Sequence, residues 1–248
     1  MEQRRLEGGV VAVAGLTGRD IEEMFAVHAR LYERVGERQF RADLAEKDWV
    51  LLLRDETDGR IRGFTTILLL DAEVRGERLR VVFSGDTGID PEFWGGQALV
   101  RAWAQFMGAL LAERPDRRLY WFLISKGYRT YLYLPLFFAT FYPRVDTVTP
   151  PFERELITTL GRLKYPRDFN PDTGVVEFAE SQGHLAPGLA ETPPHRREHA
   201  HVRFFRDKNP GWMRGHELVC VAELSAANMR GLARRMLVDG AGVLAVAS

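Results

Sequence analysis

The segment from Arg80 to Met107 constrains the fold of this chain more than any other stretch. It begins with the apolar run Val81–Phe83, typical of a strand, and continues through Ser84–Gly88, where two glycines predict a bulge or a close backbone approach. Ile89–Pro91 ends the strand, and the turn Glu92–Gly96 leads into a helix. Free backbone N–H groups and the positive end of the helix dipole would make this helix start an anion site, suited to a pyrophosphate.

The composition is that of an ordinary soluble protein. The chain has 248 residues, enough for one large or two small domains, and is 46% hydrophobic and 27% charged. Lys and Arg number 34, as do Asp and Glu, so the charge balance gives no support for a nucleic-acid partner. The longest apolar run, Tyr131–Tyr142, is too short to span a membrane, and the lone Cys220 excludes an internal disulfide. We therefore expect a cytoplasmic protein without a membrane span.

The first half of the chain predicts a mixed, mainly antiparallel sheet flanked by helices, an α/β (α+β) fold. Thr17 or Asp20 is a candidate helix cap, and Asp58-Gly59 is a hairpin signal. The strand ending at Ser125 is continuously apolar, as in a strand buried on both faces. The expected elements are a strand at 10–14, helices at 21–35 and 39–46, strands at 49–54, 61–71 and 77–83, the helix after Gly96, and a strand at 117–125.

The last hundred residues predict further elements: a helix at 152–163, strands at 175–178 and 217–224, and a helix at 226–237 capped by Ser225. A connection rich in Pro, Gly and His occupies 182–201. Because no clear linker separates the two parts, we interpret 146–248 as an elaboration that completes the sheet and covers the substrate site of a core at 8–145. A separate domain is the alternative.

The segment around Pro91 resembles the acyl-CoA-binding core of the GCN5-related N-acetyltransferase (GNAT) superfamily. That family places a strand ending in Val-x-Pro before a turn Gln/Arg-x-x-Gly-x-Gly/Ala and a long helix. Here Ile89-Asp90-Pro91 is similar to the strand end, Gly96-Gln97-Ala98 matches the second half of the turn, and Phe93 stands where Gln or Arg is usual. The family also has the same order of elements, namely a strand, two helices, three antiparallel strands and a helix. The resemblance covers about residues 8–145.

A second motif of the family follows its fifth strand, Asn-x-x-Ala-x-x-x-Tyr-x-x-x-Gly-Phe. Placing Lys126 at the Asn position puts Tyr133 on the tyrosine and Phe138 on the phenylalanine, while Lys126, Arg129 and Phe137 depart from the pattern. The resemblance implies that Tyr133 is the acid that protonates the leaving thiolate. The alternative is an aromatic residue that only packs.

The resemblance implies an N-acyltransferase that moves an acyl group from acyl-CoA or an acyl carrier protein to a primary amine of a peptide or small molecule. The oxyanion of the thioester carbonyl would be held by backbone N–H groups of the bulge at Gly85–Ile89. A non-catalytic acyl-CoA- or ligand-binding module on the same scaffold is the alternative, and Phe93 in the turn favours it. The expected cofactor-binding residues are Ile89, Trp94, Gly95, Gly96, Gln97 and Ala98.

A general base is harder to identify. Asp86 lies beside small residues on the strand nearest the expected thioester, and could accept the amine proton directly or through water. An aspartate in Gly-Asp-Thr-Gly also commonly stabilises a turn, so both interpretations of Asp86 stay open. Asp90 is expected to cap the turn before the helix.

Other polar residues predict little chemistry. His195 and His199 have the i, i+4 spacing of a zinc site, but no His-Glu-x-x-His motif or nearby cysteine accompanies them, which favours a solvated loop. Cys220 in an apolar strand is expected to be an inert thiol, and His28 on an apolar helix face a core residue. We expect no metal.

Large apolar residues are unusually dense from Leu119 to Tyr142. A helix packing on one face needs a single apolar stripe, whereas here apolar residues surround the helix. The C-terminal part or a second subunit, as in a homodimer, would cover the other side. Alternatively, these residues enclose a channel for a medium- or long-chain fatty acyl group. The residues concerned are Leu132, Leu134, Leu136, Phe137, Phe138 and Phe141.

Overall fold

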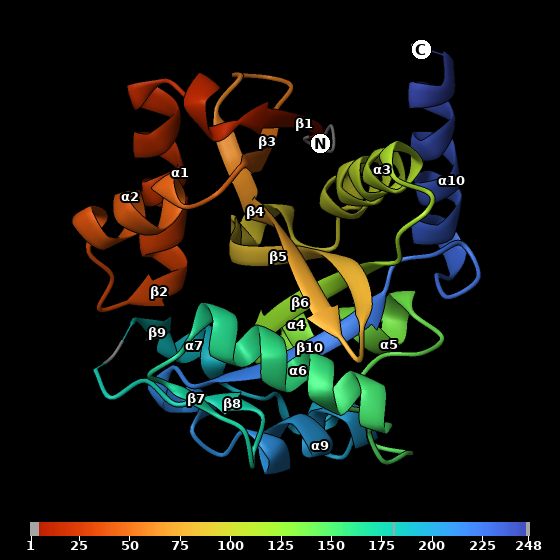
Figure 1. Cartoon of the computed structure of the whole chain (residues 1–248). Coiled ribbons are helices and arrows are strands. Elements are labelled where there is room, and N and C mark those ends of the chain that lie inside the picture. The colour runs from red at the N-terminus through yellow and green to blue at the C-terminus, as the bar shows by residue number, and fades with distance from the viewer. Residues whose placement is uncertain (1–4, 181, 247–248) are drawn as a thin grey trace. The chain divides into compact units, whose positions relative to one another are not determined.

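The computed structural model describes residues 5–180 and 182–246 (Figure 1). In this part of the chain, eight strands form a sheet in the order β1-β3-β4-β5-β6-β10-β8-β7. The pairs β1·β3, β3·β4, β6·β10, β10·β8 and β8·β7 are antiparallel. The predicted sheet type is therefore confirmed.

The chain divides into two compact units. Unit 1 comprises Met1–Leu69, Phe83–Asp116 and Gly231–Ser248, and unit 2 comprises Leu70–Val82 and Arg117–Arg230. The two long strands β4 (Ile61–Val74) and β5 (Glu77–Ile89) each contribute residues to both units.

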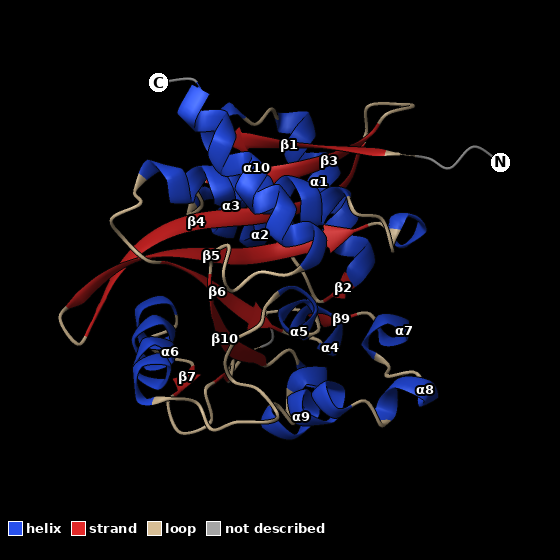
Figure 2. Cartoon of the chain, turned by 90° about the vertical axis from the view of Figure 1, so that its right-hand side faces the viewer, coloured by secondary structure: helices blue, strands red, loops and turns tan. Residues whose placement is uncertain are grey.

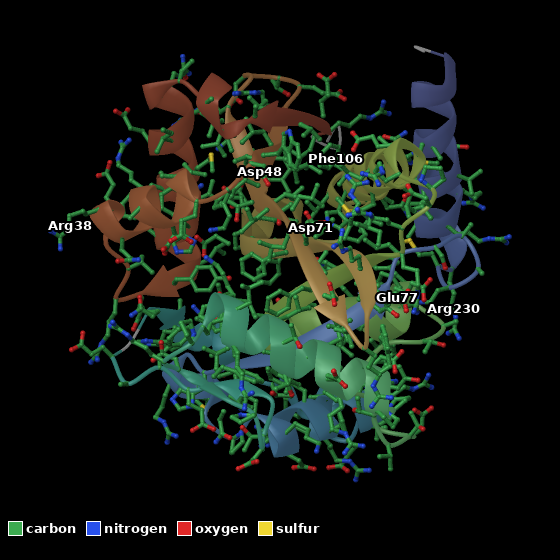
Figure 3. All side chains as sticks on the ribbon, in the orientation of Figure 1. Arg38, Asp48, Asp71, Glu77, Phe106 and Arg230 are labelled. Atoms are coloured by element: carbon green, nitrogen blue, oxygen red, sulfur yellow. The ribbon has the colours of Figure 1, made fainter. Side chains whose placement is uncertain are left out.

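In unit 1, helices cover both faces of the sheet (Figure 1). α1 and α2 lie on one face, and α3 and α10 lie on the other. Phe106 extends from α3 toward the sheet, where its ring meets that of Trp49 with centroids 5.4 Å apart (Figure 3). On the outer side of α2, Arg38 points away from the sheet into solvent (Figure 3). The elements are β1 (Leu6–Ala12), η1 (Val13–Gly15), α1 (Gly18–Leu31), β2 (Tyr32–Glu33), α2 (Glu37–Ala45), β3 (Trp49–Asp55), η2 (Pro91–Phe93), α3 (Ala98–Glu113) and α10 (Gly231–Val246).

The start of α1 shows why its boundaries differ from the predicted 21–35. The Thr17 hydroxyl accepts a hydrogen bond from the Asp20 N–H, and the Asp20 carboxylate accepts one from the Thr17 N–H. This capping box starts the helix at Gly18, and Thr17 is confirmed as the cap. The predicted first strand was also misplaced, because its pairing with β3 begins at Leu6, opposite Asp55.

Two glycines bring α3 and α10 into close contact in unit 1. A Cβ added at Gly108 would lie 1.9 Å from the Leu237 carbonyl oxygen. One added at Gly240 would lie 2.0 Å from the Gln105 carbonyl oxygen. The two helices therefore touch through their backbones, and only glycine fits at these two positions.

In unit 2, the strands after β5 form the other part of the sheet. β6 pairs with β10, with Leu123 opposite Cys220, and β10 pairs with β8. α6 packs beside β7 and β10 (Figure 2), and Gly161 of α6 lies against the Phe169 ring. The elements are β6 (Leu119–Ser125), α4 (Tyr128–Tyr131), α5 (Tyr133–Phe137), α6 (Pro151–Lys164), β7 (Phe169–Asn170), β8 (Val175–Val176), β9 (His184–Leu185), α7 (Pro187–Ala190), α8 (Pro194–Arg197), α9 (Ala200–Lys208), η3 (Trp212–Arg214) and β10 (Glu217–Glu223).

One predicted boundary in the C-terminal part was wrong. The connection at 182–201 contains two short helices, α7 and α8, each starting at a proline. The last helix begins at Gly231 instead of 226, because Ser225 caps an isolated turn by accepting the Asn228 N–H at 3.2 Å. No helix among the described residues is long and apolar enough to cross a membrane.

Candidate functional site

Strand β5 carries a bulge near its end in unit 1. A Cβ at Gly85 would meet Lys47 and Thr66, and one at Gly88 would meet Val27 and Leu31, so both positions face the side of the sheet covered by α1 and α2. Residues three apart in a regular strand point to opposite faces. One extra residue at Asp86–Thr87 therefore interrupts the alternation of side chains between the two faces of the sheet, which is the pattern of a β-bulge. A bulge leaves backbone groups outside the regular ladder, as the two glycines predicted.

The turn after β5 prepares the start of α3. Gly95 has a φ of +86°, a conformation that side-chain-bearing residues rarely adopt. The first α-helical bond of α3 runs from the Arg101 N–H to the Gln97 carbonyl, and no side chain caps the helix at Gln97. The N–H groups of Gln97 and Ala98 thus stand at the open, positive end of a 16-residue helix. This arrangement could hold an anionic phosphate.

Trp94 and Phe93 point in different directions. The Trp94 indole N–H donates to the Ile89 carbonyl at 2.8 Å, while 43% of the residue stays exposed. Phe93 is 9% exposed, and the Arg62 guanidinium lies 5.9 Å from its ring centroid. The aromatic residue at the unusual turn position is therefore part of the core of unit 1.

Asp90 does not cap the turn with its side chain, contrary to expectation. Its carboxylate forms an ion pair with Arg30 at 3.1 Å, and its backbone carbonyl accepts the Phe93 N–H. The backbone alone closes the turn, because the carboxylate is drawn toward the guanidinium on α1.

Asp86, the candidate base, lies half-buried at the bulge in unit 1. Two charged residues that the sequence did not single out lie on the same side of the unit: Asp43 at the end of α2 and the buried Lys47 just after it. Burial raises the pKa of the Asp43 carboxyl, and the negative charge of Asp86 raises it further. Because the burial of Lys47 is a property of the fold, the sequence carried no signal for this group.

Tyr133, the candidate acid, opens α5 in unit 2 and so belongs to a different unit from Asp86. Its ring stacks on that of Phe137 with centroids 5.8 Å apart. Burial raises the pKa of Tyr133, which keeps the phenol protonated at neutral pH. Pro135 lies within this five-residue helix.

Three of the six apolar residues after β6 are buried within unit 2, namely Leu134, Phe138 and Phe141. The Phe138 ring is tilted against that of Trp121 with centroids 5.7 Å apart, and the Phe141 and Tyr131 ring centroids lie 6.1 Å apart. Leu134 is fully buried, whereas Leu136 is 62% exposed.

The remaining candidates show no reactive arrangement. Burial raises the pKa of the Cys220 thiol, which is inaccessible in β10. His195 is the second residue of α8 and His199 precedes α9, so the two do not share a helix. His28 is 7% exposed and stacks on Tyr32. Within the described ranges, no group of three or more His, Cys, Asp or Glu residues is arranged to hold a metal ion.

Comparison with known proteins finds no matching family model and no matching curated protein. Solved structures of several N-acetyltransferases match this chain over about half its length. A probable N-acyltransferase from Enterococcus faecalis V583 is 20% identical, with a TM-score of 0.40 over 57% of this chain and 37% of that protein. This chain thus matches little more than a third of that protein.

Two further structures have similar scores. A GNAT family N-acetyltransferase from Escherichia coli in complex with CoA is 16% identical, with a TM-score of 0.35 over 49% of this chain and 64% of that protein. Glucosamine-6-phosphate N-acetyltransferase from Arabidopsis thaliana is 13% identical, with a TM-score of 0.35 over 47% of this chain and 80% of that protein.

Proposed function

We propose that this protein is an N-acyltransferase that transfers an acyl group from acyl-CoA to a primary amine. One observation carries the proposal: the bulge in β5, the glycine turn and the open helix start follow one another within 15 residues, Ser84–Ala98. A thioester donor needs a phosphate site and, a short distance away, hydrogen-bond donors for its carbonyl oxygen. This segment offers both from its backbone.

In this proposal, Gln97 and Ala98 bind the pyrophosphate through their N–H groups, and Gly95 and Gly96 let it approach. The exposed face of Trp94 borders the donor. Backbone N–H groups released by the bulge stabilise the oxyanion that forms when the amine attacks the thioester. The donor is CoA or, alternatively, an acyl carrier protein that presents the same thioester.

Proton transfer completes the reaction. We assign Asp86 as the base that takes the amine proton and Tyr133 as the acid that protonates the departing thiolate. The assignment of Tyr133 rests on its position in the family's tyrosine motif and not on its pKa, because burial raises that pKa and makes the phenol a weaker acid.

A medium or long acyl chain remains an option for the donor. The packing of Leu134, Phe138 and Phe141 within unit 2 accounts for half of the six apolar residues that motivated this idea. Only Leu136 in this group is prominently exposed. Each buried methylene would add about 0.8 kcal/mol to the binding free energy. If a channel exists, donors of different acyl chain length will therefore differ clearly in affinity.

Calorimetry with acetyl-, octanoyl- and palmitoyl-CoA tests the proposal. We expect micromolar binding of at least one donor, and turnover when a mixture of primary amines is added. Binding without turnover would favour the alternative of a non-catalytic module, and the absence of binding by every thioester would overturn the donor site. An affinity that falls from acetyl to octanoyl would exclude the long-chain option.

A further inference from the structure

A pocket in unit 2 lies outside the residues assigned to acyl transfer. Its volume is about 270 Å³. It is lined by residues of three segments: Glu191, Thr192 and Arg197 of the stretch after α7, Arg206 of α9, and Trp212 and Met213 of η3. We call these residues the arginine pocket. α8 packs beside α9 (Figure 2), and the proline-rich connection that carries α8 forms one wall of the pocket.

Two contacts hold this connection against the rest of unit 2. A Cβ added at Gly215, the residue after η3, would lie 2.6 Å from the Gly183 carbonyl oxygen, so the two backbones touch there. Farther along, the Arg129 guanidinium of α4 donates to the Leu189 carbonyl. The wall is therefore fixed to α4 and η3 before it reaches the pocket.

The two arginines of the pocket carry positive charges without an acidic partner. Among the residues that the structure describes, neither Arg197 nor Arg206 forms an ion pair. Arg197 Nε donates to the Thr192 backbone carbonyl at 3.3 Å, which is a neutral partner. The adjacent acid, Glu198, is paired with Arg203 at 3.5 Å. Because arginine presents its N–H groups as a planar fork that matches a carboxylate, two such groups in one pocket indicate an anionic ligand.

Thr192 provides a third polar group. Its Oγ1 is buried, and within residues 5–180 and 182–246 it has no hydrogen-bond partner. A buried hydroxyl is normally paired. Since no hydrogen bond holds this side chain in its rotamer, a rotation about χ1 toward the pocket breaks none. The hydroxyl can then donate to an anion that the arginines hold.

Trp212 and Met213 give the pocket an apolar part. Trp212 is 7% exposed, and its ring meets that of Phe205 edge-on with centroids 6.3 Å apart, which fixes the indole. Met213 is 59% exposed, and a flexible thioether side chain adapts to the shape of an apolar ligand. The volume of the pocket lies just below the range of ~300–1,000 Å³ typical of sites for drug-sized ligands, so the pocket suits a small apolar body.

The charges of the pocket select the ligand. Arg197 and Arg206 contribute two positive charges, and the exposed Glu191 contributes one negative charge. A single carboxylate therefore neutralises the group, whereas an ammonium would meet a net positive charge. We propose that the arginine pocket binds a small carboxylic acid with an apolar body, at a site separate from acyl transfer. The guanidinium groups hold the carboxylate, and the apolar body packs on Trp212 and Met213.

A series of ligands tests the charge and the apolar body separately. We expect 3-phenylpropionate to shift the indole N–H signal of Trp212 and the amide signals of Thr192 and Met213 in ¹H–¹⁵N NMR. It should bind about tenfold or more tightly than neutral 3-phenylpropan-1-ol, because the alcohol lacks the charge that the arginines hold. Acetate should also bind more weakly, because it lacks the apolar body. The absence of any shift, or an affinity for the alcohol or for acetate equal to that for the acid, overturns the proposal.

Substitutions of exposed residues test the site with the fold kept intact. Arg206→Gln should weaken the binding of 3-phenylpropionate about fivefold or more and leave that of the alcohol unchanged. Arg196→Gln is the matched control, because Arg196 is an exposed arginine that does not line the pocket, and it should bind like the wild type. Met213→Ala should weaken the acid and the alcohol alike. Full binding by both Arg206→Gln and Met213→Ala overturns the site, as does an equal loss in Arg196→Gln and Arg206→Gln.

Acetyl-CoA is the last ligand of the series, because it is also an anion. It should leave the Trp212 and Thr192 signals unchanged, and it should not displace 3-phenylpropionate. If acetyl-CoA does displace the acid, the pocket belongs to donor binding and the proposal of a separate site is wrong. Since the readout is binding in unit 2, the result does not depend on whether the protein transfers acyl groups.

Discussion

The contact between α3 and α10 allows a sharp test of the fold of unit 1. We expect Gly108→Ala to destabilise the protein, although alanine favours helices more than glycine does. The new Cβ would lie 1.9 Å from the Leu237 carbonyl oxygen and 2.8 Å from the Ala241 nitrogen, whereas real Cβ contacts stay above 3.0 Å. Both atoms belong to the backbone, so α10 has to move by about 1 Å as a whole.

The magnitude follows from two opposing terms. Overpacking of this kind costs about 1–3 kcal/mol or more. Replacing glycine by alanine inside a helix returns about 0.5–1 kcal/mol. The net loss is therefore up to about 2.5 kcal/mol, which lowers the melting temperature by up to roughly 5–10 °C for a chain of this size.

Thermal melting followed by circular dichroism measures this change. Gly242→Ala is the matched control, because it lies in α10 with no heavy atom within 4 Å of its added Cβ. The control should be neutral or more stable than the wild type by about 0.5–1 kcal/mol. If Gly108→Ala melts as high as Gly242→Ala, the two helices do not cross as described.

Three further predictions concern the donor site, the acid and the pH dependence. Gly96→Val should weaken acyl-CoA binding in calorimetry with the fold intact, because a side chain there would obstruct the approach of the phosphate to the backbone N–H groups. Unchanged affinity would move the donor site elsewhere. Tyr133→Phe should lower turnover about 10- to 1000-fold while donor affinity is kept, and wild-type turnover would leave Tyr133 a packing residue. Burial raises the pKa of Asp20, but hydrogen bonds from Arg54 and Thr17 outweigh it and lower the pKa to about 2. The ionised Asp20 carboxylate therefore stabilises the fold fully above about pH 4, and this stabilisation is lost as the pH falls through 2. In urea titrations, the free energy of unfolding should fall less between about pH 4 and pH 2 in Asp20→Asn than in the wild type.

The sequence predicted the order of elements well where hydrophobic periodicity and turn chemistry agreed. The strands before and after Asp58-Gly59, the Thr17 cap and the bulge at Gly85 all follow from local rules. The resemblance placed the turn before α3 correctly, because glycines at such a turn are required by the backbone conformation.

Long-range contacts explain the failures. Asp90 forms an ion pair with Arg30, sixty positions earlier, and no local pattern shows that this contact replaces a cap. Lys47 and Thr66 are ordinary residues in the sequence, and only the fold brings them to Gly85, Lys47 from the segment after α2 and Thr66 from β4. The interpretation of 146–248 as an elaboration of a core at 8–145 stays a prediction.

The arrangement of unit 1 also determines the order in which parts of the chain can fold during synthesis. α3 and α10 cover one face of the unit together, yet residues 117–230 are made between them. A ribosome therefore completes almost all of unit 2 while the surface of α3 around Gly108 still lacks its partner. Nascent chains that stall before Gly231 should consequently expose apolar surface and depend on chaperones, whereas chains that have released α10 should not.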